Sequence, residues 1–182
     1  MNYEEKTIER KSVYKGGIID VDVLTVMLPD GRQAKRDIVL HKGASVIIPL
    51  TENGELHLVK QFRKPIEQVS LEIPAGKLDD NEEPEVCAKR ELKEETGLIA
   101  GNIKHVLSMY STPGFSNEVL HMFIATELEK GEACADEDEF ITCEKIKVDR
   151  LVSMIFNGEI KDAKTIIGIL VAEKYLKGEI KI

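Results

Sequence analysis

Apolar residues recur along this chain in short runs separated by polar turn residues, and this pattern predicts many strands. We expect strands at residues 6–14, 18–28, 33–41, 44–50, 55–62, 103–110, 118–128 and 139–148. Asp30-Gly31 and Asn53-Gly54 are typical of the tight turns in hairpins. A further strand over residues 71–76 is expected to end in a tight turn at Ala75-Gly76.

Helices are predicted in the middle and at the end of the chain. Pro84 suits the first turn of a helix, and Gly97 suits the left-handed position just past its end. Two more helices are expected near residues 150–156 and 162–176, the second with Asp162 as its N-cap. The apolar face of that last helix follows helical spacing: Ile166, Ile167, Leu170 and Val171.

The first 42 residues are predicted to form a small antiparallel β extension, and residues 43–182 the main domain. Three short strands have too little sequence to bury both faces of their sheet. The extension must therefore pack on the rest of the chain or on a partner chain. A length of 182 residues suits one domain with such an extension.

The central helix carries candidate chemistry. Glu91, Glu94 and Glu95 are spaced i, i+3 and i+4, so their side chains share one face. Carboxylate oxygens are the ligands that Mg²⁺ prefers. Glu82 lies in the loop before the helix, within reach of the same site. These four residues are therefore candidate metal ligands.

A solvated acidic helix is the alternative interpretation, and two features count against it. Like charges four residues apart destabilise a helix, and these acids lie near the C-terminal end, which the helix dipole disfavours. Arg90 and Lys93 offset them only in part, and Val86 and Leu92 share no face that would form a broad apolar stripe. A bound cation would relieve this conflict.

Residues 76–98 read GKLDDNEEPEVCAKRELKEETGL and fill every fixed position of the Nudix box, G-x5-E-x7-R-E-U-x-E-E-x-G-U. The chain thus resembles the Nudix hydrolases, which cleave nucleoside diphosphates linked to another moiety. The resemblance implies an α/β fold, an α/β/α sandwich with a mixed sheet. It also implies that the Ala75 carbonyl is a metal ligand beside the box glutamates, and that Glu94 takes part in catalysis.

Further segments resemble the ADP-ribose pyrophosphatase branch of that family. Pro113 follows Gly97 by sixteen residues, an offset typical of that branch, although Pro-Gly also marks an ordinary turn. Gln61-Phe62-Arg63 resembles a segment whose arginine lies near the substrate diphosphate, and guanidinium suits phosphate. Glu72 is a candidate acceptor for the adenine or ribose. Arg36 is a candidate contact across a homodimer interface, which the N-terminal strands build in that branch.

The acidic run at residues 136–139 is either a solvated loop or the source of the catalytic base. In ADP-ribose pyrophosphatases a loop at this place carries a glutamate that acts as base or reaches a metal-bound water. Glu137 and Glu139 are the candidates, and Glu137 is preferred.

Charge and cysteine content limit which partners and which cellular locations are expected. A net charge of −8 argues against nucleic-acid binding. No apolar run is long enough for a membrane span, and the N-terminus has no signal-peptide segment. Three cysteines without metal-ligand spacing, Cys87, Cys134 and Cys143, favour a reducing cytoplasm over structural zinc or disulfides. Cys87 is interpreted as a small packing residue.

The resemblance predicts hydrolysis of ADP-ribose to AMP and ribose 5-phosphate by a cytoplasmic homodimer. Mg²⁺ is the expected metal, with Mn²⁺ as a substitute and no organic cofactor. Another nucleoside diphosphate sugar, such as GDP-mannose, and a dinucleoside polyphosphate are alternative substrates. Alternatives of another class are a module that senses ADP-ribose without cleaving it and a plain cation-binding domain. The intact carboxylates and the register of Gly76, Arg90 and Gly97 favour the enzyme.

Overall fold

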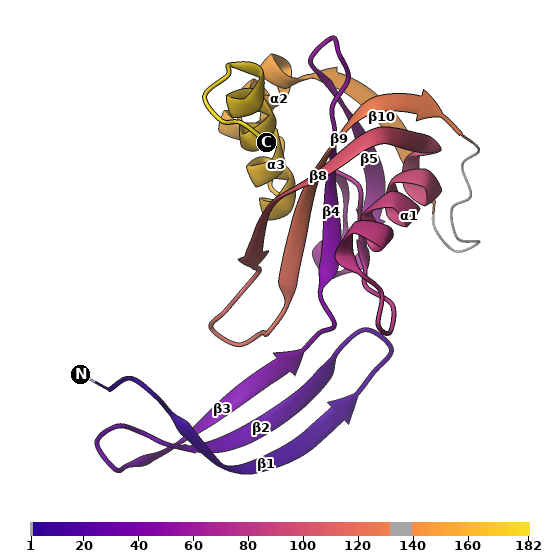
Figure 1. Ribbon diagram of the computed structural model, residues 1–182. Coiled ribbons are helices and arrows are strands. Elements are labelled where there is room, and N and C mark those ends of the chain that lie inside the picture. The colour runs from indigo at the N-terminus through magenta and orange to yellow at the C-terminus, as the bar shows by residue number, and fades with distance from the viewer. Residues whose placement is uncertain (1, 132–139) are drawn as a thin grey trace. The chain divides into compact units, whose positions relative to one another are not determined.

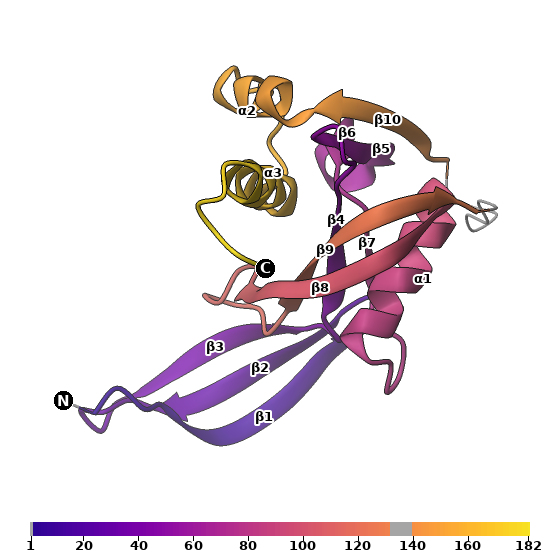
Figure 2. The same ribbon diagram turned by 45° about the horizontal axis from the view of Figure 1, so that its top comes forward.

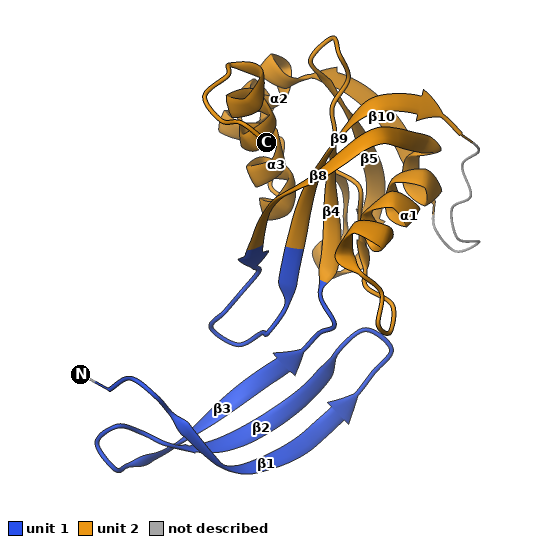
Figure 3. Cartoon of the chain, viewed as in Figure 1, with its two compact units in different colours: residues 1–43, 109–120 blue, residues 44–108, 121–182 orange. Residues whose placement is uncertain are grey.

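The computed structural model describes residues 2–131 and 140–182. The chain divides into two compact units, which Figure 3 shows in different colours. The first unit is Met1–Gly43 with Met109–Leu120, and the second is Ala44–Ser108 with His121–Ile182. The predicted extension at residues 1–42 therefore falls in a unit that also contains a later segment of the chain.

The first unit is built on a three-stranded antiparallel sheet in the order β1-β2-β3 (Figure 1). Its strands are β1 (Lys6–Lys15), β2 (Asp20–Met27) and β3 (Gln33–Leu40). Gly31 has a φ of 87°, and its N–H donates to the Leu28 carbonyl at 3.0 Å, which confirms the predicted turn between β2 and β3. Val39 in β3 also pairs with Ser116, so the later segment is attached to this sheet.

The described part of the second unit contains two sheets and three α-helices. One sheet has the order β7-β4-β9-β8, with β7 (Ala75–Lys77), β4 (Ala44–Pro49), β9 (Val119–Lys130) and β8 (Leu98–Tyr110). The other has the order β10-β5-β6, with β10 (Thr142–Lys147), β5 (Glu55–Arg63) and β6 (Gln68–Glu72). The helices are α1 (Pro84–Thr96), α2 (Val148–Phe156) and α3 (Ala163–Leu176), and a 3-10 turn, η1 (Lys64–Ile66), follows β5.

Strand β4 lies at the centre of this unit, and every residue in it is buried. Successive side chains of a strand point to opposite faces. Ile47 joins a core cluster with Ala88 and Leu92 of α1. A Cβ added at Gly168 of α3 would lie 3.3 Å from Ile48. Helices thus cover both faces of the sheet that contains β4 (Figure 2), and this confirms the predicted α/β/α fold class.

One local prediction was confirmed only in part, and another was wrong. The turn at Asn53-Gly54 forms, with Gly54 at a φ of 70°, but β4 and β5 enter different sheets after an isolated bridge between Leu50 and Leu56. Burial on both faces keeps β4 inside the four-stranded sheet. Residues 75–76 are not a turn, because Ala75 pairs with Val46 and begins β7.

None of the helices in the described part of the chain is long and apolar enough to span a bilayer.

Candidate active site

Helix α1 begins and ends where the sequence predicts. Pro84 is its first residue, and Gly97 caps its end at a φ of 68°, with its N–H donating to the Lys93 carbonyl at 2.8 Å. Its buried residues are Cys87, Ala88, Leu92 and Glu95. The apolar stripe is therefore narrow and built largely from small side chains. Burial raises the pKa of the Cys87 thiol to about 11, which fits its predicted packing role.

Gly76 gives Glu91 the space that its carboxylate occupies. A Cβ added at Gly76 would lie 1.7 Å from Glu91 Oε1 and 2.3 Å from Oε2. No side chain fits there without moving the carboxylate. The first glycine of the box and its first helical glutamate are thus in direct contact, fifteen residues apart in the chain.

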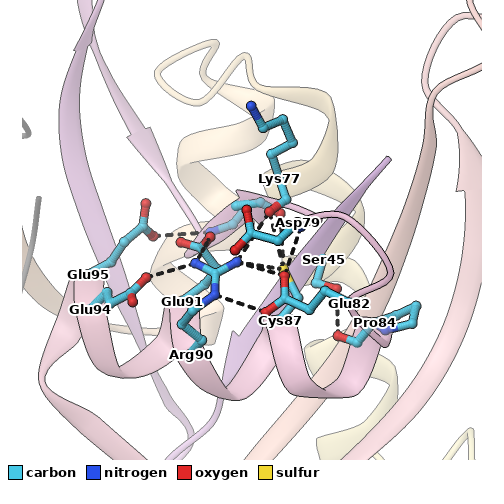
Figure 4. A network of polar contacts seen from close by, with 12 residues as sticks. Ser45, Lys77, Asp79, Glu82, Pro84, Cys87, Arg90, Glu91, Glu94 and Glu95 are labelled. Atoms are coloured by element: carbon cyan, nitrogen blue, oxygen red, sulfur yellow. Dashed lines mark hydrogen bonds and ion pairs between the residues drawn. The ribbon is translucent and has the colours of Figure 1, made fainter. Parts of the chain in front are cut away.

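Arg90 lies at the centre of three of the predicted metal-binding carboxylates (Figure 4). Its guanidinium donates to Glu82 at 3.0 and 2.9 Å, to Glu91 at 2.6 Å and to Glu94 at 2.9 Å. Hydrogen bonds from Arg90 hold the pKa of Glu82 at about 2, and those to the carboxylates raise the pKa of Arg90. One arginine therefore relieves the repulsion expected between the acidic side chains of this helix. It does so more fully than the position of that arginine in the sequence suggested.

Glu95 points to the strand rather than to Arg90. Its side chain is buried and accepts a hydrogen bond from the Ala75 N–H at 3.1 Å (Figure 4). The predicted metal ligands therefore lie on β7, on the loop before α1 and on α1 itself. Within residues 2–131 and 140–182, no three carboxylate, imidazole or thiol side chains are already arranged around a common metal position.

The donor chemistry of these residues suits a divalent cation. Their donor atoms are carboxylate and carbonyl oxygens, which hard cations prefer. The Arg90 guanidinium already places positive charge among three of them. The contact between Glu91 and Gly76 leaves that carboxylate close to the backbone of β7.

A second charged cluster lies where β5 and β6 meet. Arg63 donates two hydrogen bonds to Glu72, at 2.9 and 2.7 Å, and Lys164 of α3 donates to the same carboxylate. Burial raises the pKa of Glu72, but the hydrogen bonds and charges of Arg63 and Lys164 outweigh burial and hold it at about 2. Glu72 is thus an ionised carboxylate with two cationic partners.

Beyond Val59, which pairs with Glu72, the same face of this strand pair is polar. Gln61 pairs with Ser70 and Arg63 with Gln68, so the register places their side chains on the face that carries Glu72. A pocket of about 490 Å³ lies beside this face. Its lining residues come from β5, η1, β6 and the start of α3: Arg63, Pro65, Ile66, Gln68, Ser70, Glu72, Lys161, Asp162, Ala163 and Lys164.

Two predicted site residues lie in the first unit, and two lie outside the described residues. Arg36 and Pro113 belong to the first unit, where Arg36 forms hydrogen bonds of 2.9 and 2.6 Å with Glu5. Glu137 and Glu139 lie outside the described residues. Sequence reasoning missed Lys164, because nothing in the local sequence links it to a residue 92 positions away.

Comparison with known proteins places the chain in a family. A family model described as NUDIX domain matches residues 39–167, and the chain belongs to this family. It is 44% identical to an ADP-ribose pyrophosphatase of Bacillus subtilis (strain 168), over 89% of each protein. It is 40% identical to a methanol dehydrogenase activator of Bacillus methanolicus, over 92% of this chain and 91% of that protein.

A solved structure supports the same fold. The crystal structure of an ADP compounds hydrolase superposes with a TM-score of 0.86 over the whole of both chains, at 17% sequence identity. The predicted Nudix fold and the resemblance to ADP-ribose pyrophosphatases are thereby confirmed.

Proposed function

We propose that this Nudix enzyme hydrolyses the diphosphate of ADP-ribose and releases AMP and ribose 5-phosphate. The observation that carries the proposal is the presence, in one compact unit, of the full set of box carboxylates and of Arg63 on the polar face of β5 and β6. The identity with the ADP-ribose pyrophosphatase of Bacillus subtilis supports this substrate. Water supplies the oxygen that bonds to one phosphorus while the bridging P–O bond breaks.

Mg²⁺ is the proposed metal, with Mn²⁺ as a substitute, and no organic cofactor is required. Glu91, Glu94, Glu95 and the Ala75 carbonyl would hold it, with Glu82 as the fifth candidate ligand. When bound, such a metal neutralises charge on the diphosphate and lowers the pKa of a water molecule. Glu95 is held in place by the Ala75 N–H, so one hydrogen bond positions two of the proposed ligands.

Protein groups supply the other elements of the reaction. Arg63 is proposed to bind phosphate oxygens, because Glu72 occupies its Nε and one Nη2 hydrogen, and among the described residues the Nη1 side of the guanidinium is left for a ligand. Gln61, on the same face, is proposed to contact the substrate beside it. Glu137 is the proposed base that takes the proton from water, with Glu139 as the alternative.

Product analysis tests the proposal directly. The metal-stripped chain is incubated with ADP-ribose, with and without added Mg²⁺, and the products are separated by chromatography. We expect AMP and ribose 5-phosphate in the presence of Mg²⁺ and no turnover in excess chelator. GDP-mannose and a dinucleoside polyphosphate, tested in parallel, would replace ADP-ribose as the assigned substrate if either is turned over with a much higher kcat/KM. Tight binding of ADP-ribose without any product would instead indicate a sensing module.

A second candidate function follows from the Bacillus methanolicus relative, whose identity to this chain is close to that of the pyrophosphatase. We propose that hydrolysis by this chain can also activate a methanol dehydrogenase. The test adds the wild-type chain or its Glu95→Gln variant to a methanol dehydrogenase assay. Stimulation by the wild type alone would support activation through hydrolysis, and equal stimulation by both would show that hydrolysis is not involved.

The finer expectations on assembly and location are also proposals. We propose a homodimer, because β1 is exposed along its whole length in the single chain and presents Ile8, Val13 and Tyr14 half-exposed. A substrate contact from Arg36 or Pro113 is proposed within that dimer. A cytoplasmic location is proposed because Cys87 and Cys143 are free thiols.

A further inference from the structure

The Glu72 carboxylate forms ion pairs with two cations, and these cations come from segments that are far apart in the sequence. Its side chain is 4% exposed, and it lies between Arg63, at the end of β5, and Lys164, in the first turn of α3. Arg63 uses Nε and Nη2 for this contact, so Glu72 fixes one edge of the guanidinium. Oε1 of Glu72 accepts from Arg63, and Oε2 accepts from both cations.

Lys164 is held in position by the start of its helix. Asp162 accepts hydrogen bonds from the Thr165 N–H at 3.0 Å, from the Thr165 hydroxyl at 2.6 Å and from Lys164 at 2.9 Å. The Thr165 hydroxyl in turn accepts from the Ile73 N–H at 2.9 Å. The N-terminus of α3 is therefore bonded to the residue that follows Glu72, and the Lys164 side chain, 14% exposed, has little freedom to leave.

This arrangement gives Lys164 a role that does not require it to touch the substrate. We propose that Lys164 is a positioning residue for diphosphate binding: it holds Glu72 in place, so that Glu72 orients Arg63 with its remaining N–H groups free for phosphate oxygens. This inference rests on the proposed function of Arg63. Lys164 also pairs with Asp162, so the cluster of two cations and two carboxylates is formally neutral, and Lys164 acts by fixing the Glu72 carboxylate and not by adding net charge.

Lys161 provides a matched control. It lines the same pocket, lies three residues before Lys164 and carries the same charge, but it is exposed and forms no ion pair among the described residues. A general loss of positive charge near the pocket would affect both lysines alike. Loss of the contact with Glu72 would affect Lys164 alone.

The experiment measures kcat and KM for ADP-ribose at saturating Mg²⁺ in Lys164→Met, Lys164→Arg and Lys161→Met. For Lys164→Met we expect KM to rise about tenfold with kcat within about twofold, because a hydrogen bond to a charged group is lost from the binding site and not from the reacting atoms. Lys164→Arg should restore most of the KM, and Lys161→Met should raise KM clearly less than Lys164→Met does. If Lys164→Met does not fold, Lys164→Gln takes its place, since it keeps a hydrogen-bond donor without the charge.

A double variant separates positioning from direct contact. In an Arg63→Met background, adding Lys164→Met should raise KM no further, because Lys164 acts through Arg63. An undiminished second increase would overturn the positioning role, and so would equal effects of the two lysine variants or a Lys164→Met variant with the wild-type KM. Failure of the proposed function is recognised separately, because the wild-type chain would then hydrolyse none of the diphosphate substrates. Calorimetric binding of ADP-ribose would in that case provide the same comparison of variants.

Discussion

At the scale of single residues, the three glutamates of α1 have different surroundings although their spacing is regular. Glu91 lies against Gly76, Glu94 shares Arg90 with Glu91, and Glu95 is buried against the Ala75 N–H. The surrounding residues therefore make three similarly spaced glutamates different: one carboxylate is bonded to the backbone, and two share a guanidinium. The residue that contacts each glutamate can be substituted separately.

Glu95→Gln is expected to lower kcat by about a hundredfold or more while the fold remains intact. The amide keeps an oxygen that can accept from the Ala75 N–H, but it removes a negative charge from the proposed metal site. Steady-state kinetics at saturating Mg²⁺ and circular dichroism check both parts. A variant with near wild-type kcat would show that Glu95 is not a ligand.

Gly76→Ala is expected to weaken metal binding and activity strongly. Its Cβ would overlap the Glu91 carboxylate, which would have to move away from β7. Gly17→Ala is the control, because a Cβ at Gly17 meets nothing within 4 Å. Calorimetric titration with Mg²⁺ should show a loss of affinity for Gly76→Ala only, and equal affinity in the two variants would contradict the contact's role.

Glu72 should make the stability of the fold depend on acid pH. Its pKa is about 2 in the folded chain and lies below the ordinary value of 4.5, so its ionised form stabilises the fold above about pH 4.5. That contribution is lost as the pH falls from there through about 2. The difference in free energy of unfolding between the wild type and Glu72→Gln, measured in urea, should therefore be constant from pH 8 to 5 and shrink at lower pH. A difference that does not change down to pH 3 would contradict the assigned pKa.

At the scale of elements, the ends of helices could be predicted because their signals are local. Pro84, Gly97 and Asp162 each act within one turn, and each has the predicted position in the structure. Strand β7 could not be predicted, since Ala75 becomes a strand residue only by pairing with Val46, which is distant in the chain. The contact of Lys164 with Glu72 is equally non-local, and it depends on how α3 is attached to Ile73.

Asp162 should matter to α3 both as a cap and as an anion. Asp162→Ala removes the acceptor for Thr165 and is expected to cost about 1–2 kcal/mol of stability. Asp162→Asn keeps a capping oxygen and should recover most of that stability. Thermal unfolding of both variants provides the comparison. Equal destabilisation by the two changes would assign the effect to the ion pair with Lys164 and not to the cap.

At the scale of the whole molecule, an acidic chain must bind an acidic substrate. The net charge is −8, and the second unit meets this difficulty with a few cations, of which Arg63, Arg90 and Lys164 are held by carboxylates. General attraction of anions is thereby weak, and binding depends on local groups and on metal. Composition argues against nucleic acid as a partner for this reason, but it could not identify which cations would be oriented.

The first unit leads to a prediction about assembly. All ten residues of β1 are exposed in the single chain, and its apolar residues Ile8 and Val13 have exposed fractions of 51% and 50%. A three-stranded sheet with such a strand needs cover, and a two-fold partner is the commonest source. Light scattering of the full chain at micromolar concentration should therefore give the mass of a dimer. A chain that begins at Gly43 should be monomeric, because it lacks the whole sheet to which Ser116 is attached. A monomeric full chain would refute the dimer, and a truncated chain that remains dimeric and active would place the interface on the second unit instead.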